Sequence, residues 1–332
     1  MKAIVYEVYG SPDVLQVKDI QKPVVGDDDV LVRVRAAALN PLDWHFMRGE
    51  PYLMRLMTGL LKPKTNCLGA DLAGQVEAVG KNVTRFGPGD DVFADIADGP
   101  WGSLAEYVCV SDDWLEPKPT NLTFEQAAAV PLAASTALQG LRDVGRIEAG
   151  QRVLIIGASG GVGTFALQLA KWFGAEVTGV CSTRNLDLVR SLGADHVIDY
   201  TREDFARGVQ RYDLIFQLAG TRSASDCRRA LTPRGTLVLS SGDGGGHWLG
   251  PLFRLVRALA LSPFVGQKLV TFVTKKNRSD LLTMKGLIEA GDVTPVIDRQ
   301  YTLSEVPEAM RYLEEGHARG KVVITWESTD HT

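Results

Sequence analysis

Hydrophobic and polar positions follow two different periods along this chain, and the change lies near residue 123. Before it, short segments alternate apolar and polar residues, most clearly VLVRVRAAAL at 30–39. Similar segments follow at 72–80, 90–96 and 105–110, separated by Gly, Pro and Asp turns. Alternation over so few residues is typical of half-buried strands. The pattern predicts a small antiparallel or barrel-like β domain.

After this point, strand patterns alternate with helical ones. Thr123, with Gln126 three residues later, is typical of a helix N-terminus. From Val153 onward, short apolar runs alternate with amphipathic segments, which is the signature of βαβ units and a parallel sheet. Short strand patterns return after residue 293, and the last one fits the first domain. The sequence predicts an α/β chain in which a Rossmann domain, a doubly wound parallel sheet at 124–292, interrupts a β domain at 1–123 and 293–332.

The stretch VLIIGASGGVG at 153–163 joins an apolar strand to a helix through a glycine-rich turn. Gly160 and Gly163 fit the dinucleotide fingerprint, and Ala158 replaces its first glycine. A helix N-terminus in this position offers free N–H groups to phosphate. In the helix that follows, Phe165, Leu169 and Trp172 are expected on one face. We interpret the turn as a dinucleotide-phosphate site; the alternative is a glycine loop with no ligand.

Composition narrows the class of protein. The 332 residues carry a net charge of -4, which provides no basic field for nucleic acid. The four cysteines are widely spaced, so neither a disulfide framework nor a structural zinc lobe is expected. The polar first ten residues do not fit a signal peptide, and no apolar stretch reaches the length of a membrane span. We expect a cytoplasmic protein with no integral membrane segment.

The segment WLGPLFRLVRALALSPFV at 248–265 leaves two interpretations open. It could lie on a membrane surface as a basic amphipathic helix. It could instead pack on the protein, over the active site or at a subunit contact, which we favour because Arg254 and Arg257 are its only cations. The apolar stretch 248–273 could then pair two Rossmann edges in a homodimer or cover the cleft in a monomer.

Several motifs in this order resemble the medium-chain dehydrogenase/reductase superfamily. They include AAALNPLDW (36–44), LGADLAGQVEAVG (68–80), AAAVPLAASTALQGL (127–141), GASGGVG (157–163) and GHARGKVVIT (316–325). Within the superfamily, the chain is similar to the zinc-independent quinone oxidoreductase and enone reductase branch. The resemblance implies a GroES-like catalytic domain, a Rossmann domain and an active site in the cleft between them.

The same resemblance indicates whether the chain keeps the ligands of a catalytic metal. Zinc alcohol dehydrogenases of the superfamily place a cysteine in a Cys-x-x-Asp segment and a histidine in a Gly-His-Glu segment. The matching residues here are Asn40 and Ala70, and the loss of two ligands leaves no competent tetrahedral site. His45 and Asp71 remain nearby, and we interpret them as hydrogen-bonded structural groups. We therefore expect no metal.

The end of the second Rossmann strand, EVTGVC at 176–181, indicates which nicotinamide cofactor binds. NAD preference usually requires an acidic residue there for the ribose hydroxyl groups, but none precedes Asp187. Ser182 and Arg184 can bind a 2′-phosphate instead, and the resemblance adds Tyr200. NADPH is therefore the expected cofactor, unless Arg184 is only a solvated loop charge.

Further cofactor contacts are expected from two sources. The glycine turn and the carboxyl ends of parallel strands face the ligand crevice, which gives Ser159, Gly160, Gly161, Val162, Gly163, Leu218, Ala219 and Ser241. The resemblance implies Asn40, Thr136, Phe272, His317, Arg319 and Lys321.

Without a metal, the substrate must itself accept hydride readily, as quinones and α,β-unsaturated carbonyls do. The developing oxyanion needs hydrogen-bond donors, and the resemblance suggests Tyr52 and Arg48, with the Asn40 amide as a third candidate. The apolar segment 50–66 could line a substrate pocket or pack a short helix.

These features predict an NADPH-dependent oxidoreductase of quinones or enones. Two alternatives stay open: an NADPH-binding regulatory or scaffold protein with little turnover, and a stand-alone enoyl reductase of lipid or polyketide type.

Overall fold

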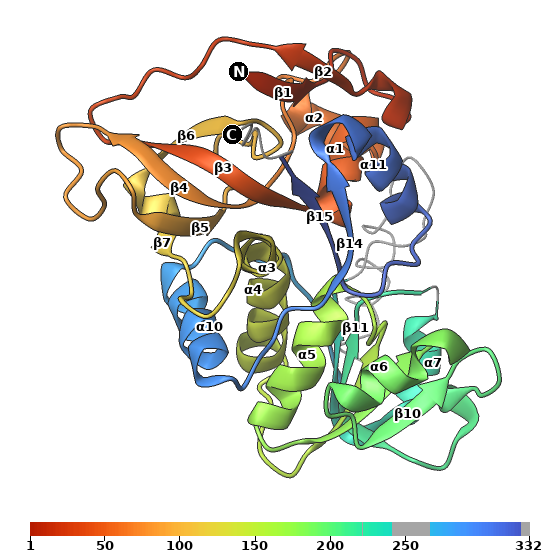
Figure 1. Ribbon diagram of the computed structural model, residues 1–332. Coiled ribbons are helices and arrows are strands. Elements are labelled where there is room, and N and C mark those ends of the chain that lie inside the picture. The colour runs from red at the N-terminus through yellow and green to blue at the C-terminus, as the bar shows by residue number, and fades with distance from the viewer. Residues whose placement is uncertain (221, 241–265, 327–332) are drawn as a thin grey trace.

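The computed structural model describes residues 1–220, 222–240 and 266–326, and its strands form two large sheets (Figure 1). The first sheet and its helices occupy the upper half of Figure 1, and the parallel sheet occupies the lower half. Helix α3 (Phe124–Ala128) lies between them and packs on the first sheet. Its N-terminus carries the predicted capping box, in which Thr123 Oγ1 accepts from the Gln126 N–H.

The upper sheet has seven strands, mostly antiparallel. In the order β14-β15-β3-β4-β5-β7, with β6 also paired to β3, they are β14 (Ile297–Thr302), β15 (Lys321–Thr325), β3 (Asp29–Leu39), β4 (Asp71–Val79), β5 (Asp91–Asp95), β7 (Glu116–Pro117) and β6 (Tyr107–Ser111). β15 pairs antiparallel with β3, so the last strand completes the sheet of the N-terminal part, as predicted. The domain boundaries at 123 and 293 stay predictions.

Smaller elements flank this sheet. The strands β1 (Lys2–Val5) and β2 (Gln16–Asp19) form an antiparallel pair. The helices α1 (Pro41–Arg48), α2 (Arg55–Thr58) and α11 (Val306–Glu314) also lie in the upper half. α1 follows β3 directly, with Asn40 as its N-cap and Gly49, whose φ of 60° is left-handed, as its C-cap. This junction fixes where Asn40 lies.

The lower sheet is parallel throughout. Its order is β10-β9-β8-β11-β12-β13, comprising β10 (His196–Asp199), β9 (Glu176–Cys181), β8 (Arg152–Ile156), β11 (Tyr212–Gln217), β12 (Leu231–Leu239) and β13 (Lys268–Thr271). In chain order this is the 3-2-1-4-5-6 arrangement of the doubly wound dinucleotide fold.

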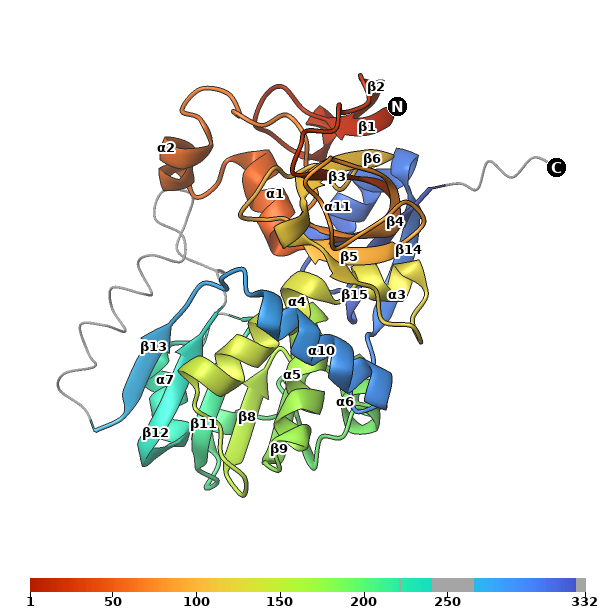
Figure 2. The same cartoon turned by 90° about the vertical axis from the view of Figure 1, so that its left-hand side faces the viewer.

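Apolar side chains bury both faces of this sheet. Along β8, Val153 and Ile155 join one core cluster, whereas Leu154 and Ile156 join another. The first face is covered by α4 (Pro131–Gln139), α5 (Gly161–Trp172) and α10 (Arg278–Ala290), and Figure 2 shows α4, α5 and α10 in front of the strands. α7 (Ala224–Ala230) covers the other face, and α6 (Leu186–Ser191) follows β9.

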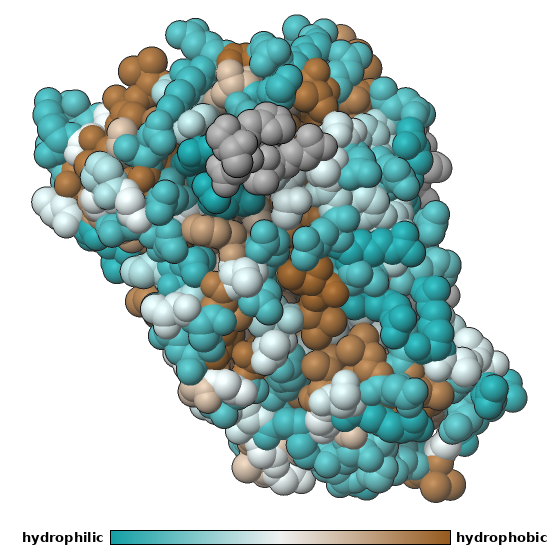
Figure 3. Space-filling view, viewed as in Figure 1, coloured by the Kyte–Doolittle hydropathy of each residue, from teal (hydrophilic) through white to brown (hydrophobic). Residues whose placement is uncertain are grey.

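The predicted face of α5 is only partly correct. Phe165 and Leu169 are fully buried, but Trp172 is 47% exposed in the last turn and contacts Phe173 edge-on. On the side seen in Figure 3, hydrophilic residues cover much of the surface between separate apolar patches. Within the described residues, no helix combines the length and apolar character that crossing a membrane requires. The predicted segment 248–265 and Ser241 lie outside the described residues.

Candidate active site

The glycine turn lies between β8 and α5, and its glycines have different steric requirements. A Cβ on Gly163 would lie 2.1 Å from the carbonyl oxygen of Gly157, so Gly163 allows close packing of helix on strand. Gly157 itself has φ of +85° and approaches Ala219. A Cβ on Gly160 would meet only one atom within 4 Å, at 3.5 Å. The turn is therefore compact underneath and open above Gly160, which fits a pyrophosphate.

The end of β9 carries polar groups beside this turn. Asn185 Nδ2 donates to Ser159 Oγ at 2.8 Å, while Asn185 Oδ1 is buried with no hydrogen-bond partner among the described residues. Arg184 is exposed and its Nη2 donates to the His317 carbonyl at 2.9 Å. Tyr200, 53% exposed, follows the neighbouring strand β10. An exposed guanidinium at the end of β9 suits the phosphorylated ribose of a dinucleotide.

The turn at 316–320 brings the upper half of the molecule over the glycine turn. Asp298 holds it by accepting from the Arg319 N–H at 2.8 Å and from the Tyr312 hydroxyl at 2.6 Å. The side chains of His317 and Arg319 are exposed. The turn ends at Gly320, with φ of +117°, and Lys321 enters the interior.

Two further predicted residues lie on the lower half. Thr136 Oγ1, in α4, donates to the Leu132 carbonyl at 2.7 Å and lies 2.6 Å from Thr274 Oγ1, whose hydrogen it accepts. Phe272 follows β13 and packs near Phe216 at a ring distance of 6.3 Å. These contacts tie the segment after β13 to α4, where the resemblance places the nicotinamide.

Asn40, Asp71 and Lys321 form a buried polar cluster where β3, β4 and β15 meet. Lys321 Nζ donates to Asn40 Oδ1 at 2.5 Å and to Asp71 Oδ2 at 3.1 Å. Asn40 Nδ2 donates to the same Asp71 oxygen at 3.0 Å and to the Ala38 carbonyl at 3.3 Å. The Leu132 N–H binds Asp71 Oδ1 at 2.9 Å. Asn40 therefore has no amide hydrogen left for a substrate, which removes it from the candidate donors.

Two more carboxyl groups lie close to this cluster. Asp43 caps α1 by accepting from the Asn40 N–H at 2.7 Å, and also accepts from Gly69 N–H at 3.1 Å. Burial raises the pKa of Asp43 to about 7. Burial also raises the pKa of Asp95 to about 7, and the carboxylate of Asp71, its partner across β4 and β5, contributes. Asp71 receives three hydrogen bonds, one of them from an ammonium, and a buried charge requires such partners.

The side chains of Arg48 and Tyr52 make contacts that the sequence does not indicate. Arg48 forms a two-pronged ion pair with Glu314 of α11, so its guanidinium ties α1 to α11 and is not oriented toward a substrate. The Tyr52 ring is half-buried and lies 4.6 Å from the Arg55 guanidinium, which also covers Tyr9 at 4.6 Å. The role of Tyr52 stays a prediction, whereas the Arg48 guanidinium is already paired with Glu314.

The apolar segment after Tyr52 is largely exposed. The fractional exposure is 63% for Leu56, 80% for Met57, 66% for Leu60 and 93% for Leu61. The segment forms the short helix α2, but these side chains neither pack it on the protein nor enclose a pocket within the described residues. The short helix forms without packing of these four side chains, and a substrate pocket lined by the segment stays a prediction.

The residues at the positions of zinc ligands have other partners. Asn40 binds Lys321 and Asp71, and Ala70 is buried in the upper core. His45 Nδ1 donates to the Glu50 carbonyl at 2.8 Å. Across the part of the chain that the structure describes, no three His, Cys, Asp or Glu side chains gather as metal ligands.

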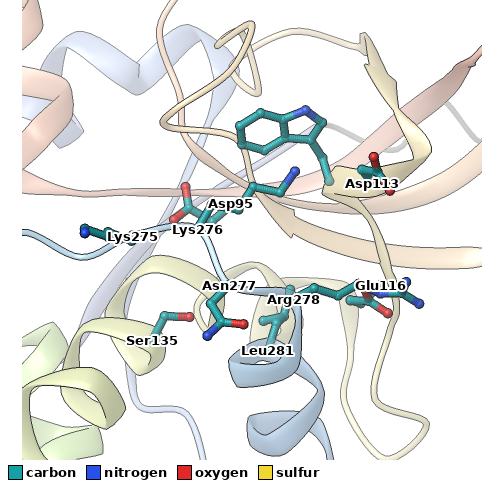
Figure 4. A pocket seen from close by; sticks show the side chains of 10 residues that line it. Asp95, Asp113, Glu116, Ser135, Lys275, Lys276, Asn277, Arg278 and Leu281 are labelled. Carbon is teal, nitrogen blue, oxygen red and sulfur yellow. The ribbon is translucent and has the colours of Figure 1, made fainter. Parts of the chain in front are cut away.

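A small polar cleft lies at another junction of the two halves, where residues 275–278 pass β5 and β7 (Figure 4). Three of its charged side chains have partners. Arg278 contacts Glu116, which also binds Arg85, and the Lys276 ammonium lies 3.6 Å from the Trp114 ring centre. The cleft is a contact between domains, and we assign no ligand to it.

Sequence reasoning missed three contributions to the site. Lys321 was expected only as a cofactor contact, and its pairing with Asp71 joins residues 250 positions apart. Asn185 was missed, although an Asn directly after Ser182-Thr183-Arg184 is a helix-capping signal. Thr274 follows a strand end that faces the crevice, which is a signal of the same kind as for Ser241.

Comparisons with known proteins agree with this architecture. Residues 26–120 match the family model described as the alcohol dehydrogenase GroES-like domain, and residues 192–324 match the one described as a zinc-binding dehydrogenase. A quinone oxidoreductase from Coxiella burnetii has a solved structure similar to this one, with a TM-score of 0.86 and 32% identity over 98% of this chain and 99% of that chain. The predicted GroES-like domain and Rossmann fold are confirmed.

Curated relatives define the family more closely. The chain is 37% identical to a 2-methylene-furan-3-one reductase of Solanum lycopersicum, over 98% of this chain and 79% of the relative. It is equally similar, at 37% over the same shares, to a chloroplastic NADPH-dependent alkenal/one oxidoreductase of Arabidopsis thaliana. With Asn40 and Ala70 at the zinc-ligand positions, the chain belongs to the zinc-independent quinone oxidoreductase and enone reductase branch of the medium-chain dehydrogenase/reductase superfamily.

Proposed function

We propose that this protein is an NADPH-dependent oxidoreductase that transfers hydride to quinones or α,β-unsaturated carbonyls. The observation that carries the proposal is the open glycine turn at Gly160, with Ser182 and Arg184 at the end of the neighbouring strand β9. No carboxylate stands between the end of β9 and Asp187. The names of the relatives, an alkenal/one oxidoreductase and a furanone reductase, support the substrate class.

The residues present fit this cofactor. We propose that 159–163 hold the pyrophosphate, that Ser182, Arg184 and Tyr200 face the 2′-phosphate, and that Thr136 and Phe272 lie at the nicotinamide end. When bound, NADPH supplies the hydride. The protein supplies orientation and donors for the substrate oxyanion.

An acceptor screen tests the proposal directly. NADPH oxidation would be followed at 340 nm with 9,10-phenanthrenequinone, but-3-en-2-one, trans-2-hexenal and an enoyl thioester. We expect turnover of the quinone or the enone. Bound NADPH without oxidation by any acceptor would instead support a regulatory protein, and preference for the thioester would support an enoyl reductase of lipid or polyketide type.

Replacement of Arg184 by Gln should lower the preference for NADPH over NADH. The change removes one charge-assisted contact to the 2′-phosphate, so kcat/KM with NADPH should fall about 10-fold or more while kcat/KM with NADH changes little. Arg190→Gln, in an exposed pair with Asp187, is the matched control. An equal loss with both cofactors would show that Arg184 matters only for holding the 316–320 turn.

Replacement of Tyr52 by Phe should lower kcat only modestly, by about 10-fold or less, because water or another donor can supply the proton. Steady-state kinetics with the enone would measure it. A fall of several orders of magnitude would identify Tyr52 as an essential acid.

Location and assembly stay predictions. We retain a cytoplasmic site of action, although the alkenal/one oxidoreductase of Arabidopsis thaliana carries the word chloroplastic in its name, and a possible homodimer. Size-exclusion chromatography with light scattering would decide the second.

A further inference from the structure

The Lys321 side chain is only 3% exposed, yet it carries an ammonium into the junction of the two halves. Burying an ammonium removes its hydration, and a buried lysine is therefore rare unless it is paired. Asp71 provides the counter-charge at 3.1 Å. A well-packed apolar pair of similar volume would often be as stable as such an ion pair. Stability alone therefore does not explain why a lysine is buried at position 321.

The number of hydrogens that each group can donate distinguishes Lys321 from its neighbours. Asn40 has two amide hydrogens, and they are donated to Ala38 and Asp71. Asp71, as a carboxylate, only accepts. The ammonium of Lys321 has three hydrogens, and within the described residues it gives one to Asn40 and one to Asp71. One charged donor is left in the cluster.

The position of this donor relates it to the cofactor turn. The lysine stem passes the first residue of α5, because a Cβ on Gly161 would lie 3.0 Å from Lys321 Cδ. Its partner Asp71 binds the Leu132 N–H in the first turn of α4, one turn before Thr136. The side chain thus extends from the phosphate-binding turn toward the end of α4 where the nicotinamide is expected.

We propose that Lys321 is a catalytic residue whose remaining ammonium hydrogen binds the carbonyl oxygen of the substrate. The inference rests on the proposed function. Asn40 and Asp71 orient the ammonium, and they do not contact the substrate. In the zinc-dependent members the segments around Asn40 and Ala70 carry metal ligands. In this chain the positively charged side chain of Lys321 lies between Asn40 and Asp71, the residue after Ala70.

The chemistry balances for an enone as follows. Hydride adds to the β-carbon, the carbon–carbon π pair moves toward the carbonyl carbon, and the carbonyl π pair moves onto oxygen. The enolate oxygen receives the Lys321 hydrogen bond, which strengthens as charge develops. A proton from solvent then adds to the α-carbon, and the enolate collapses to the saturated ketone. The substrate gains two electrons, which come from the nicotinamide.

The test compares two acceptors that need oxyanion stabilisation to different extents. But-3-en-2-one is a weak hydride acceptor, whereas 9,10-phenanthrenequinone gives a much more stable anion. Lys321→Met keeps the apolar stem and removes the donor. Lys321→Met with Asp71→Asn also removes the unpaired carboxylate, so that a folded variant is available. Lys171→Met, which breaks an exposed pair with Asp195, is the control.

We expect both Lys321 variants to lose about 10²–10³-fold in kcat/KM with the enone, which is the effect of removing one oxyanion donor. The loss with the quinone should be at least about tenfold smaller, because its transition state needs less stabilisation from the enzyme. The Kd for NADPH, measured by nicotinamide fluorescence, should stay within about twofold of wild type, since the donor acts on the substrate. Lys171→Met should change none of the three.

Equal losses with both acceptors, matched by a rise in the Kd for NADPH, would overturn the inference and leave Lys321 as a cofactor contact. Unchanged enone turnover in the folded variants would also overturn it. These outcomes differ from failure of the proposed function, in which the wild-type protein itself oxidises NADPH with neither acceptor, and the inference falls with it.

Discussion

Replacing Asp71 by Asn should lower the free energy of unfolding by about 3–5 kcal/mol, because it leaves the ammonium of Lys321 buried without its counter-charge. Asp71 is fully buried and Lys321 is 3% exposed, so water cannot replace the lost partner. The substitution also weakens the acceptor for the Leu132 N–H and for the Asn40 amide. Urea denaturation followed by circular dichroism would measure the change.

A double-mutant cycle identifies the cause of that loss. Adding Lys321→Met to Asp71→Asn removes the unpaired charge, and we expect more than about half of the lost stability to return. Glu77→Gln breaks an exposed pair with Lys22, at 2.7 Å with both side chains about 40% exposed, and should cost less than about 1 kcal/mol. If Asp71→Asn costs no more than Glu77→Gln, the buried pair contributes as little as a surface pair.

Regular structure in this protein could be predicted from its sequence because the signals are local. The alternation in β3, the capping box at Thr123 and the glycine turn each involve residues a few positions apart. Repeated strand and helix patterns then indicated the parallel sheet, whose order the structure provides. Each of these features depends on the backbone conformation of the few residues that form it, so it can be recognised without knowledge of the rest of the fold.

The polar contacts of the site are different, because they join distant parts of the chain. Arg48 binds Glu314 across 266 positions, and Lys321 binds Asn40 across 281. A sequence pattern can indicate that each residue is charged or polar but not which partner satisfies it. The exposed side chains of α2 show the same limit for apolar residues, since hydrophobicity alone does not specify what covers them.

Replacing Gly163 by Ala should destabilise the protein by about 3 kcal/mol and abolish NADPH binding. The new Cβ would lie 2.1 Å from the Gly157 oxygen and 2.8 Å from the Ala158 carbonyl carbon and oxygen. All three are backbone atoms, which cannot rotate away as a side chain can. α5 must therefore move off β8, and its N-terminus no longer points at the bound phosphates.

Gly160→Ala separates packing from binding in the same turn. A Cβ at Gly160 would contact only the Gly157 oxygen, at 3.5 Å, and the backbone there is extended, with φ of −82°. Its stability should therefore stay within about 0.5 kcal/mol of wild type. The methyl group would still occupy the open space above the turn, so the Kd for NADPH should rise about 10-fold or more. Thermal unfolding and nicotinamide fluorescence of the two variants measure both effects.

Two outcomes would contradict these expectations. If Gly163→Ala is as stable as Gly160→Ala, the contact of α5 with β8 does not depend on the missing side chain at Gly163. If Gly160→Ala binds NADPH with the wild-type Kd, the pyrophosphate does not approach the backbone at Gly160.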